Sequence, residues 1–310
     1  MSFDFFAFDS RFFWEDVYNY NDWVIQLNVR TLKYRLVDPL GVKRESGDFE
    51  LCKETLLKYI EACELTDLKE NTVIILHGFG KKKSSTKFLA KGLKDINANI
   101  IALNYATLRR GIAYHAKILA QMLQNTEIKG KLYIINIGAS CLITRKLISD
   151  SNNYRRFNIE KIIDVNPMNS GSDLAELLVK KRVFNFILGP MLKDITTSVA
   201  VKFKKLPQEI DHGIIFVTGP FMRFTKRLLA KFESFPFSTP PSERSYADKI
   251  KDIDAETWFA LNDTKLLNIC KNFITTGDFA TKFKPFTDSK IKTTGKSEAD
   301  STKKIRKKEK

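Results

Sequence analysis

Short apolar runs alternate with amphipathic stretches through the middle of this chain, and this alternation constrains its fold more than any other feature. Apolar runs of about four to eight residues are typical of buried strands, and apolar residues three or four positions apart are typical of helices. A repeating order of strand, loop and helix predicts a mostly parallel sheet with helices on both faces. The predicted strands are residues 72–76, 99–104, 132–137, 161–165 and 213–219, and the predicted helices are 86–96, 111–123 and 141–148.

Functional residues are expected in four loops of this sheet. Open α/β sheets bind ligands in the crevice at the carboxyl ends of their strands. We therefore expect chemistry in the loops that begin after Leu76, Asn104, Ile137 and Val165.

The first 66 residues are expected to form an N-terminal part of their own. Ten of the 36 aromatic residues lie within the first 23 positions, which favours a segment packed across the domain surface, with docking to a membrane interface or a partner as the alternative. Residues 23–50 are rich in β-branched and aromatic residues around a turn, which predicts a small β-meander, and residues 51–65 have helical spacing. The predicted division is 1–66, a main domain at 67–280 and a tail at 281–310.

Positive charge is concentrated at the C-terminus of the 310-residue chain. The formal net charge is +16, and residues 281–310 alone hold eleven Lys or Arg and four Asp or Glu, or +7. This stretch has no apolar period, which predicts a solvated, disordered basic tail. The excess charge favours an acidic partner such as an acidic protein, an anionic membrane surface or nucleic acid.

Several classes of protein are excluded by the sequence. No apolar run reaches the roughly 18 residues of a transmembrane helix. The four cysteines lack metal-binding or disulfide-framework spacing, so no metal or cofactor is predicted and a reducing compartment is favoured. The N-terminus carries acids where a signal peptide needs basic residues, which predicts a cytoplasmic protein, with export through a C-terminal signal as the alternative.

The loop HGFGKKKSST after the first predicted strand combines glycines, lysines and serines, as phosphate-binding loops do. A Walker A motif needs Gly five residues before its Gly-Lys pair, but Ile75 stands there, and Lys82 stands where Ser or Thr is needed. A nucleotide-binding loop is therefore disfavoured. The loop instead resembles the His-Gly turn at the end of an early central strand of the α/β-hydrolases, here His77-Gly78. The resemblance implies that a backbone N–H near Phe79 points at an oxyanion.

The chain from Val73 to Phe279 resembles the bacterial lipase/esterase-type α/β-hydrolases, with several segments in the family's order and spacing. The resemblance implies an α/β-hydrolase fold with a small N-terminal β extension, and an activity on esters that depends on a Ser, an acid and a His held together. The matching segments are VIILHGFG, KLYIINIGASCLITRKLI, IIDVNPMNSGSDLAELL, FNFILGPMLKDITT and FITTGDF.

The position of the nucleophile has two readings. The family's elbow, Gly-x-Ser-x-Gly-Gly, aligned without gaps from Lys131, puts Gly138 at the nucleophile position and small residues, Ser140 and Cys141, where the glycines pack. The nucleophile would then be lost. In the second interpretation Ser140 is the nucleophile of a broken elbow. The N–H groups near Phe79 and Cys141 are then the oxyanion donors, and Ala139 belongs to the pocket. Cys141 as a nucleophile is a further alternative to its being a small buried filler.

The base and the acid of the triad have no clear counterpart. The family's histidine precedes the last helix, and counting from Asp248 places Glu256 at that position. No histidine follows His212, while His115 lies within a predicted helix and is expected to be structural. A hydroxyl without a base is a poor nucleophile.

The sequence therefore predicts a lipase/esterase-like protein that is catalytically impaired and acts by binding. The expected partners are an acyl or lipid ligand, or an acidic protein; peripheral contact with a membrane is allowed, and nucleic acid is disfavoured. The alternative is an active serine carboxylesterase or lipase that uses Ser140. Basic clusters at 81–83 and 109–110 are expected at the rim of the site, where they could hold an anionic ligand.

Overall fold

The computed structural model describes residues 13–65, 68–126, 128–150, 154–220, 223, 241–257 and 260–279. The chain divides into two units, residues 1–280 and residues 281–310. The basic tail and the first twelve residues of the aromatic segment lie outside the described residues. The expectations for these two segments stay predictions.

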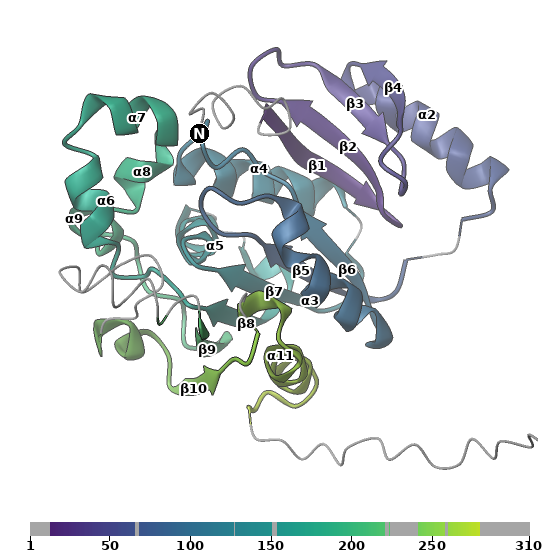
Figure 1. Ribbon diagram of the computed structural model, residues 1–310. Helices are drawn as coiled ribbons and strands as arrows, with labels where there is room; N and C mark the ends of the chain where they lie inside the picture. The colour runs from purple at the N-terminus through teal and green to yellow at the C-terminus, as the bar shows by residue number, and fades with distance from the viewer. Residues whose placement is uncertain are drawn as a thin grey trace, which may run out of the picture. The chain divides into compact units, whose positions relative to one another are not determined.

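A six-stranded parallel sheet forms the centre of the first unit (Figure 1), with the strand order β10-β9-β8-β7-β5-β6. The predicted mostly parallel sheet is confirmed. The sequence did not reveal β10, because Ile253 is its only buried residue and charged residues occupy four of its positions. The strands are β5 (Asn71–Leu76), β6 (Ala98–Leu103), β7 (Leu132–Ile137), β8 (Ile159–Val165), β9 (Asp211–Thr218) and β10 (Lys249–Asp254).

Helices cover both faces of this sheet, as predicted. Successive strand residues point to opposite faces, so that Ile74 and Ile134 pack against one helical layer while Ile75 and Ile135 pack against the other. Each face therefore has its own continuous apolar core. The first layer contains α4 (Ile112–Asn125) and α5 (Ser140–Asp150), and the second contains α3 (Lys87–Gly92) and α11 (Thr264–Thr276).

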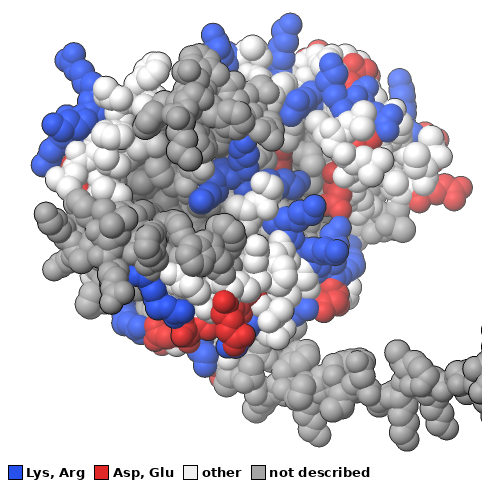
Figure 2. Space-filling model, viewed as in Figure 1, with Lys and Arg blue, Asp and Glu red and all other residues white. Residues whose placement is uncertain are grey.

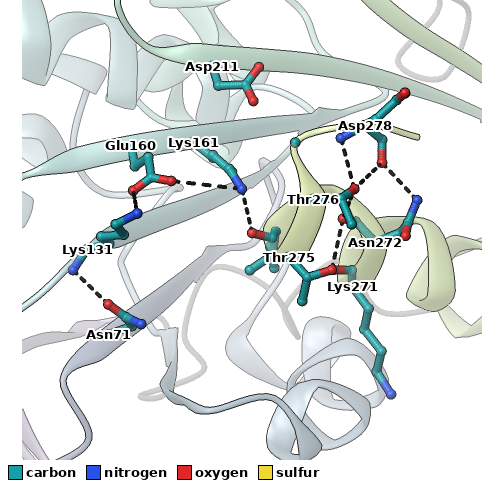
Figure 3. Close-up of polar contacts among 12 residues, drawn as sticks. Asn71, Lys131, Glu160, Lys161, Asp211, Lys271, Asn272, Thr275, Thr276 and Asp278 are labelled. Atoms are coloured by element: carbon teal, nitrogen blue, oxygen red, sulfur yellow. Dashed lines mark hydrogen bonds and ion pairs between the residues drawn. The ribbon is translucent and has the colours of Figure 1, made fainter. Parts of the chain in front are cut away.

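A buried lysine fixes the end of α11 to the sheet (Figure 3). Lys161 of β8 donates a hydrogen bond from Nζ to the carbonyl oxygen of Ile274, 2.7 Å away, in the last turn of the helix. The last carbonyl groups of a helix lack partners within it, and a cation there is favoured by the helix dipole. This contact lies at the edge of the sheet opposite the carboxyl ends of the strands.

An antiparallel four-stranded sheet, in the order β1-β2-β3-β4, precedes the central sheet. Three of its strands and one helix correspond to the predicted meander and helix. The first strand was not predicted as a strand, although its aromatic and β-branched residues fit one. Its carboxylate groups reach the main domain: Asp16 accepts a hydrogen bond from Asn104 N, 2.9 Å away, and Glu15 lies 2.9 Å from His115. These elements are β1 (Trp14–Tyr20), β2 (Trp23–Asn28), β3 (Tyr34–Val37), β4 (Lys43–Gly47) and α2 (Phe49–Ala62).

Four short helices lie between β8 and β9. Residues 173–206, which contain them, are called the cap below, and Figure 1 shows them grouped beyond one end of the central sheet. None of the helices in the described parts of the chain is long and apolar enough to cross a membrane. The cap helices are α6 (Asp173–Leu178), α7 (Arg182–Leu188), α8 (Met191–Asp194) and α9 (Thr197–Ala200).

Candidate functional site

The sharp turn between β7 and α5 is built around Gly138. Its backbone has a φ of +59°, in the left-handed region that favours glycine, and its N–H donates to the Val165 carbonyl oxygen at 2.9 Å. A β-carbon added at Gly138 would meet no atom closer than the Asn166 carbonyl oxygen, 3.9 Å away. The turn thus has the strained strand-to-helix form of a nucleophile elbow. There is space for a side chain at Gly138, but glycine has none.

Ser140, the alternative nucleophile, is completely buried. Its hydroxyl oxygen accepts a hydrogen bond from Ile137 N at 2.7 Å. It also lies 3.2 Å from the Leu76 carbonyl oxygen and 3.0 Å from that of Ile137, to which it can donate. The hydroxyl therefore joins the ends of β5 and β7.

Cys141 is buried as well, and its thiol is held in the protonated form. Burial raises the pKa of this thiol well above its ordinary value, and the carboxylates of Asp164 and Glu243 add to the increase. The thiolate is the nucleophilic form of cysteine. In this environment Cys141 packs as a small apolar residue of the core.

The turn after β5 carries the other half of the predicted site. Gly78 approaches β7 so closely that a β-carbon on it would lie 3.4 Å from the Ile137 carbonyl oxygen. Within the described part of the chain, neither the Phe79 amide nor the Ala139 amide has a hydrogen-bond acceptor. Two such amides near one point can stabilise a negatively charged or carbonyl oxygen.

His77 supports this turn from behind. Its imidazole is fully buried, stacks on the Tyr105 ring with centroids 4.1 Å apart, and has Nδ1 3.0 Å from the Gly78 carbonyl oxygen. Burial lowers the pKa of His77 to about 4. The ring is therefore neutral at pH 7 and acts as a structural support.

These two turns meet at a cavity of about 460 Å³. That volume lies within the usual range for small-molecule sites, roughly 300–1,000 Å³. Of the predicted site residues, Gly78, Phe79, Gly138 and Ala139 line it, whereas His77, Ser140 and Cys141 lie behind its wall. The rest of the described lining is mostly apolar, with a few polar residues: Lys81, Ser84, Ser85, Ile137, Asn166, Met168, Ser172, Leu174, Ala175, Leu178, Leu188, Leu192, Ile195, Ala260, Leu261 and Asn262.

The described lining contains no histidine, cysteine, aspartate, glutamate or tyrosine. Glu256, predicted at the family's histidine position, is exposed and pairs with Lys265. The residue of the same loop that brings a polar side chain to the cavity is Asn262, further along the chain. No group of three or more metal-ligating side chains occurs among the residues that the structure describes.

A buried histidine and carboxylate lie beneath the elbow. His212, the second residue of β9, has Nε2 2.9 Å from Asp164 Oδ2, and Asp164 Oδ1 accepts from Asn136 Nδ2 at 2.8 Å. The Nδ1 atom of His212 lies 3.1 Å from the Tyr246 carbonyl oxygen. Both ring nitrogens are therefore occupied, and neither His212 nor Asp164 lines the cavity.

The predicted basic rim is only partly formed. Lys81 lines the cavity. Arg110 instead donates to the Val29 carbonyl oxygen at 2.6 Å, and the Arg109 guanidinium stacks over Phe13. Arg109 and Arg110 therefore bind the N-terminal part of the chain. Contacts between residues so far apart cannot be predicted from the local sequence.

The cap lining was also missed by sequence analysis. Leu174, Leu178, Leu188 and Leu192 come from three short helices and meet only in the folded chain. Each of these helices is too short for its apolar residues to show a helical period. They give the cavity its apolar wall opposite the two turns.

No family model and no curated protein matches this sequence. Among solved structures, the chain is similar to the mature form of a lipase from Bacillus licheniformis, with 14% identity over 68% of this chain and 94% of the lipase and a TM-score of 0.48. It is also similar to a lipase-esterase related protein from Clostridium acetobutylicum (16% identity, 66% and 95% coverage, TM-score 0.40). A thermophilic esterase from Thermogutta terrifontis gives 10% identity, 68% and 91% coverage and a TM-score of 0.43.

The topology of the chain itself assigns the fold. The order of six parallel strands, the helices on both faces and the tight turn after β7 are those of the α/β-hydrolase fold. The four antiparallel strands before it form the predicted N-terminal extension. The chain therefore has an α/β-hydrolase fold with an N-terminal β-sheet.

Proposed function

We propose that this protein binds an acyl ligand in the cavity of its α/β-hydrolase domain without hydrolysing it. The observation that carries the proposal is Gly138: the elbow has its strained geometry and its open space, but glycine has no side chain that can attack a carbonyl group. The elbow is retained as architecture while the nucleophile is missing.

The neighbouring groups do not replace the missing chemistry. The Ser140 hydroxyl is buried and makes three contacts to backbone atoms. The Cys141 thiol has a raised pKa, which keeps it protonated. A serine nucleophile needs an adjacent base, and the described lining of the cavity contains no histidine, aspartate or glutamate. Loss of triad members costs several orders of magnitude in rate.

The cavity retains what an acyl group needs for binding. Leucine and isoleucine side chains of the cap form an apolar wall that suits a hydrocarbon chain. The amides of Phe79 and Ala139 can donate to the carbonyl or carboxylate oxygen at its end, and the Lys81 side chain adds positive charge at the same cavity. An apolar chain with an oxygen-rich end fits this distribution.

Displacement of a fluorescent fatty acid from the full chain tests the binding site. Leu178 lines the cavity, whereas its neighbour Leu177 is 46% exposed. Leu178→Trp should fill the cavity and weaken binding about tenfold or more, and Leu177→Trp, the matched control, should bind like the unaltered protein. Equal affinities of the two variants would place the ligand elsewhere and overturn the proposal.

The alternative, an active esterase that uses Ser140, makes a different prediction. It requires labelling by a fluorophosphonate probe that disappears in Ser140→Ala. Labelling that persists in this variant would instead point to Ser84 or Ser85, the exposed and half-buried hydroxyls at the cavity. We expect no labelling of the full chain.

We also propose that the protein works in the cytoplasm. All four cysteines are free, three of them buried and Cys63 exposed. Unpaired thiols are typical of reducing compartments. Fractionation of the native host, with Cys63 recovered as a free thiol, is the test; recovery from the extracellular medium would contradict it.

A further inference from the structure

The outer surface of the cap combines exposed apolar side chains with positive charge, and we infer that it docks on an anionic lipid membrane. Val183 is 65% exposed and Phe186 is 78% exposed, both on α7, a helix in which no residue is buried. Exposed apolar residues that cluster mark an interaction surface. This inference concerns the outside of the cap and does not depend on which ligand occupies the cavity.

The periodicity of α7 separates an outer face from an inner face. Residues three or four positions apart share a helix face, so that Arg182, Val183 and Phe186 lie together. Leu188, on the opposite side of the helix, lines the cavity. One apolar side of α7 therefore packs toward the protein interior, and the other is free to contact an apolar partner outside the protein.

The cap that carries this apolar face is basic. Between residues 173 and 206 the chain has seven Lys or Arg and three Asp or Glu, a net charge of +4. Figure 2 shows Lys and Arg side chains projecting beside uncharged surface, where Figure 1 places α7. All seven cationic residues are exposed: Lys180, Lys181, Arg182, Lys193, Lys202, Lys204 and Lys205.

The acids of the cap are turned to internal contacts. Asp194 accepts a hydrogen bond from the Ile112 amide at 2.7 Å. Asp173 accepts from the Thr197 hydroxyl, and Glu176 from that of Ser198. The negative charges therefore fix the cap in place. Of the cations, Lys205 donates to the Ser245 carbonyl oxygen at 3.1 Å, while Lys180, Lys181 and Arg182 are exposed at the start of α7.

The shape of this surface favours a membrane over an acidic protein. Phe186 is 78% exposed on a short helix, and a protein partner would need a preformed pocket to bury it. A bilayer interface accepts phenylalanine and valine without such a pocket, while long Lys and Arg side chains reach the headgroups. Clusters of four to eight such cations next to an apolar helix face are typical of contacts with anionic lipids.

Flotation of the full chain with vesicles tests this inference. Vesicles of equal parts phosphatidylcholine and phosphatidylglycerol should bind the protein, and vesicles of phosphatidylcholine alone should bind it at least about tenfold more weakly. The variant Val183→Ser/Phe186→Ser should reduce partitioning into the anionic vesicles by about tenfold or more. The control variant Leu40→Ser/Val42→Ser, which removes two exposed apolar residues from the turn between β3 and β4, should leave partitioning unchanged.

A second pair of variants tests the charge. Lys180→Gln/Lys181→Gln/Arg182→Gln should weaken binding by about tenfold or more, whereas Lys33→Gln/Lys43→Gln/Lys58→Gln, exposed lysines of the N-terminal part, should have a smaller effect than the cap variant. The basic tail is identical in every variant.

Three results would overturn the inference. The first is unchanged partitioning of Val183→Ser/Phe186→Ser, which would assign any vesicle binding to other cations of the chain. The second is no binding to anionic vesicles. The third is capture by immobilised poly-glutamate that depends on Phe186 while vesicle binding does not, because the partner would then be an acidic protein.

Discussion

The hydroxyl oxygen of Ser140 lies 2.7 Å from the amide nitrogen of Ile137, and solvent reaches no part of the Ser140 side chain. The only serine in the elbow sequence is therefore used to close the turn. Gly138, two positions earlier, lies at the cavity wall and brings no side chain to it.

Replacing Ser140 by alanine should destabilise the protein without changing any activity. The substitution leaves the buried Ile137 N–H without its acceptor, which costs about 1–3 kcal/mol. Urea unfolding should show this loss, and Ser149→Ala, which removes a half-buried hydroxyl from the same helix, should cost less than about 0.5 kcal/mol. A normal stability for Ser140→Ala would mean that the hydroxyl does not close the turn.

Gly138→Ser should restore a hydroxyl to the elbow without restoring catalysis. The added β-carbon has space, but the left-handed backbone should cost roughly 1–2 kcal/mol of stability. Gly80→Ser, with a φ of +67° and open space around it, is the control for backbone strain. Both variants should release no nitrophenol from p-nitrophenyl esters, because the described cavity lining has no histidine or carboxylate to act as the base. Turnover by Gly138→Ser alone would reveal a base there.

The stability of the protein should fall with acid because of His77. Burial lowers the pKa of this imidazole to about 4, against an ordinary value near 6.5. Between these two values the unfolded chain binds a proton that the folded chain does not, so unfolding becomes easier as the pH drops from 6.5 to 4, by roughly 3 kcal/mol in total.

His77→Phe isolates this effect, because it keeps a ring against Tyr105 and removes the titrating group. The free energy of unfolding of the variant minus that of the unaltered protein should increase by roughly 3 kcal/mol as the pH falls from 6.5 to 4. A difference that stays constant with pH would show that His77 titrates alike in both states.

The buried pair of Asp164 and His212 should contribute far more to stability than an exposed pair. Asp164→Ala leaves His212 Nε2 and Asn136 Nδ2 without their acceptor in the core, which should cost about 3–5 kcal/mol. Asp252→Ala, which breaks the exposed pair with Arg244, should cost less than about 1 kcal/mol. Similar losses measured by chemical denaturation would contradict the role given to the buried pair.

Most of the central sheet could be predicted from the sequence because its strands are buried on both faces. Such strands form continuous apolar runs, as Val73–Leu76 and Leu132–Ile137 do. The edge strand β10 carries four charged residues, and β1 was read only as an aromatic segment. Both form part of a sheet because of pairing with a neighbouring strand, which a local pattern does not record.

The candidate site was predictable only where it depends on local geometry. The resemblance to the family's elbow, Gly-x-Ser-x-Gly-Gly, led to Gly138, Ser140 and Cys141, which lie together at one tight strand-to-helix turn. The cap wall, Asn262 and the Asp164–His212 pair could not be found in this way, because each joins residues that are distant in the sequence. Their side chains meet through the folding of long connections between strands.

Native mass spectrometry of the full chain after incubation with p-nitrophenyl decanoate tests the central claim most directly. The account predicts a complex with the mass of protein plus intact ester, no covalent acyl adduct and no nitrophenolate in solution. A covalent acyl-protein, or nitrophenolate released in excess over the protein, would show that the elbow region still performs hydrolysis and would contradict the account.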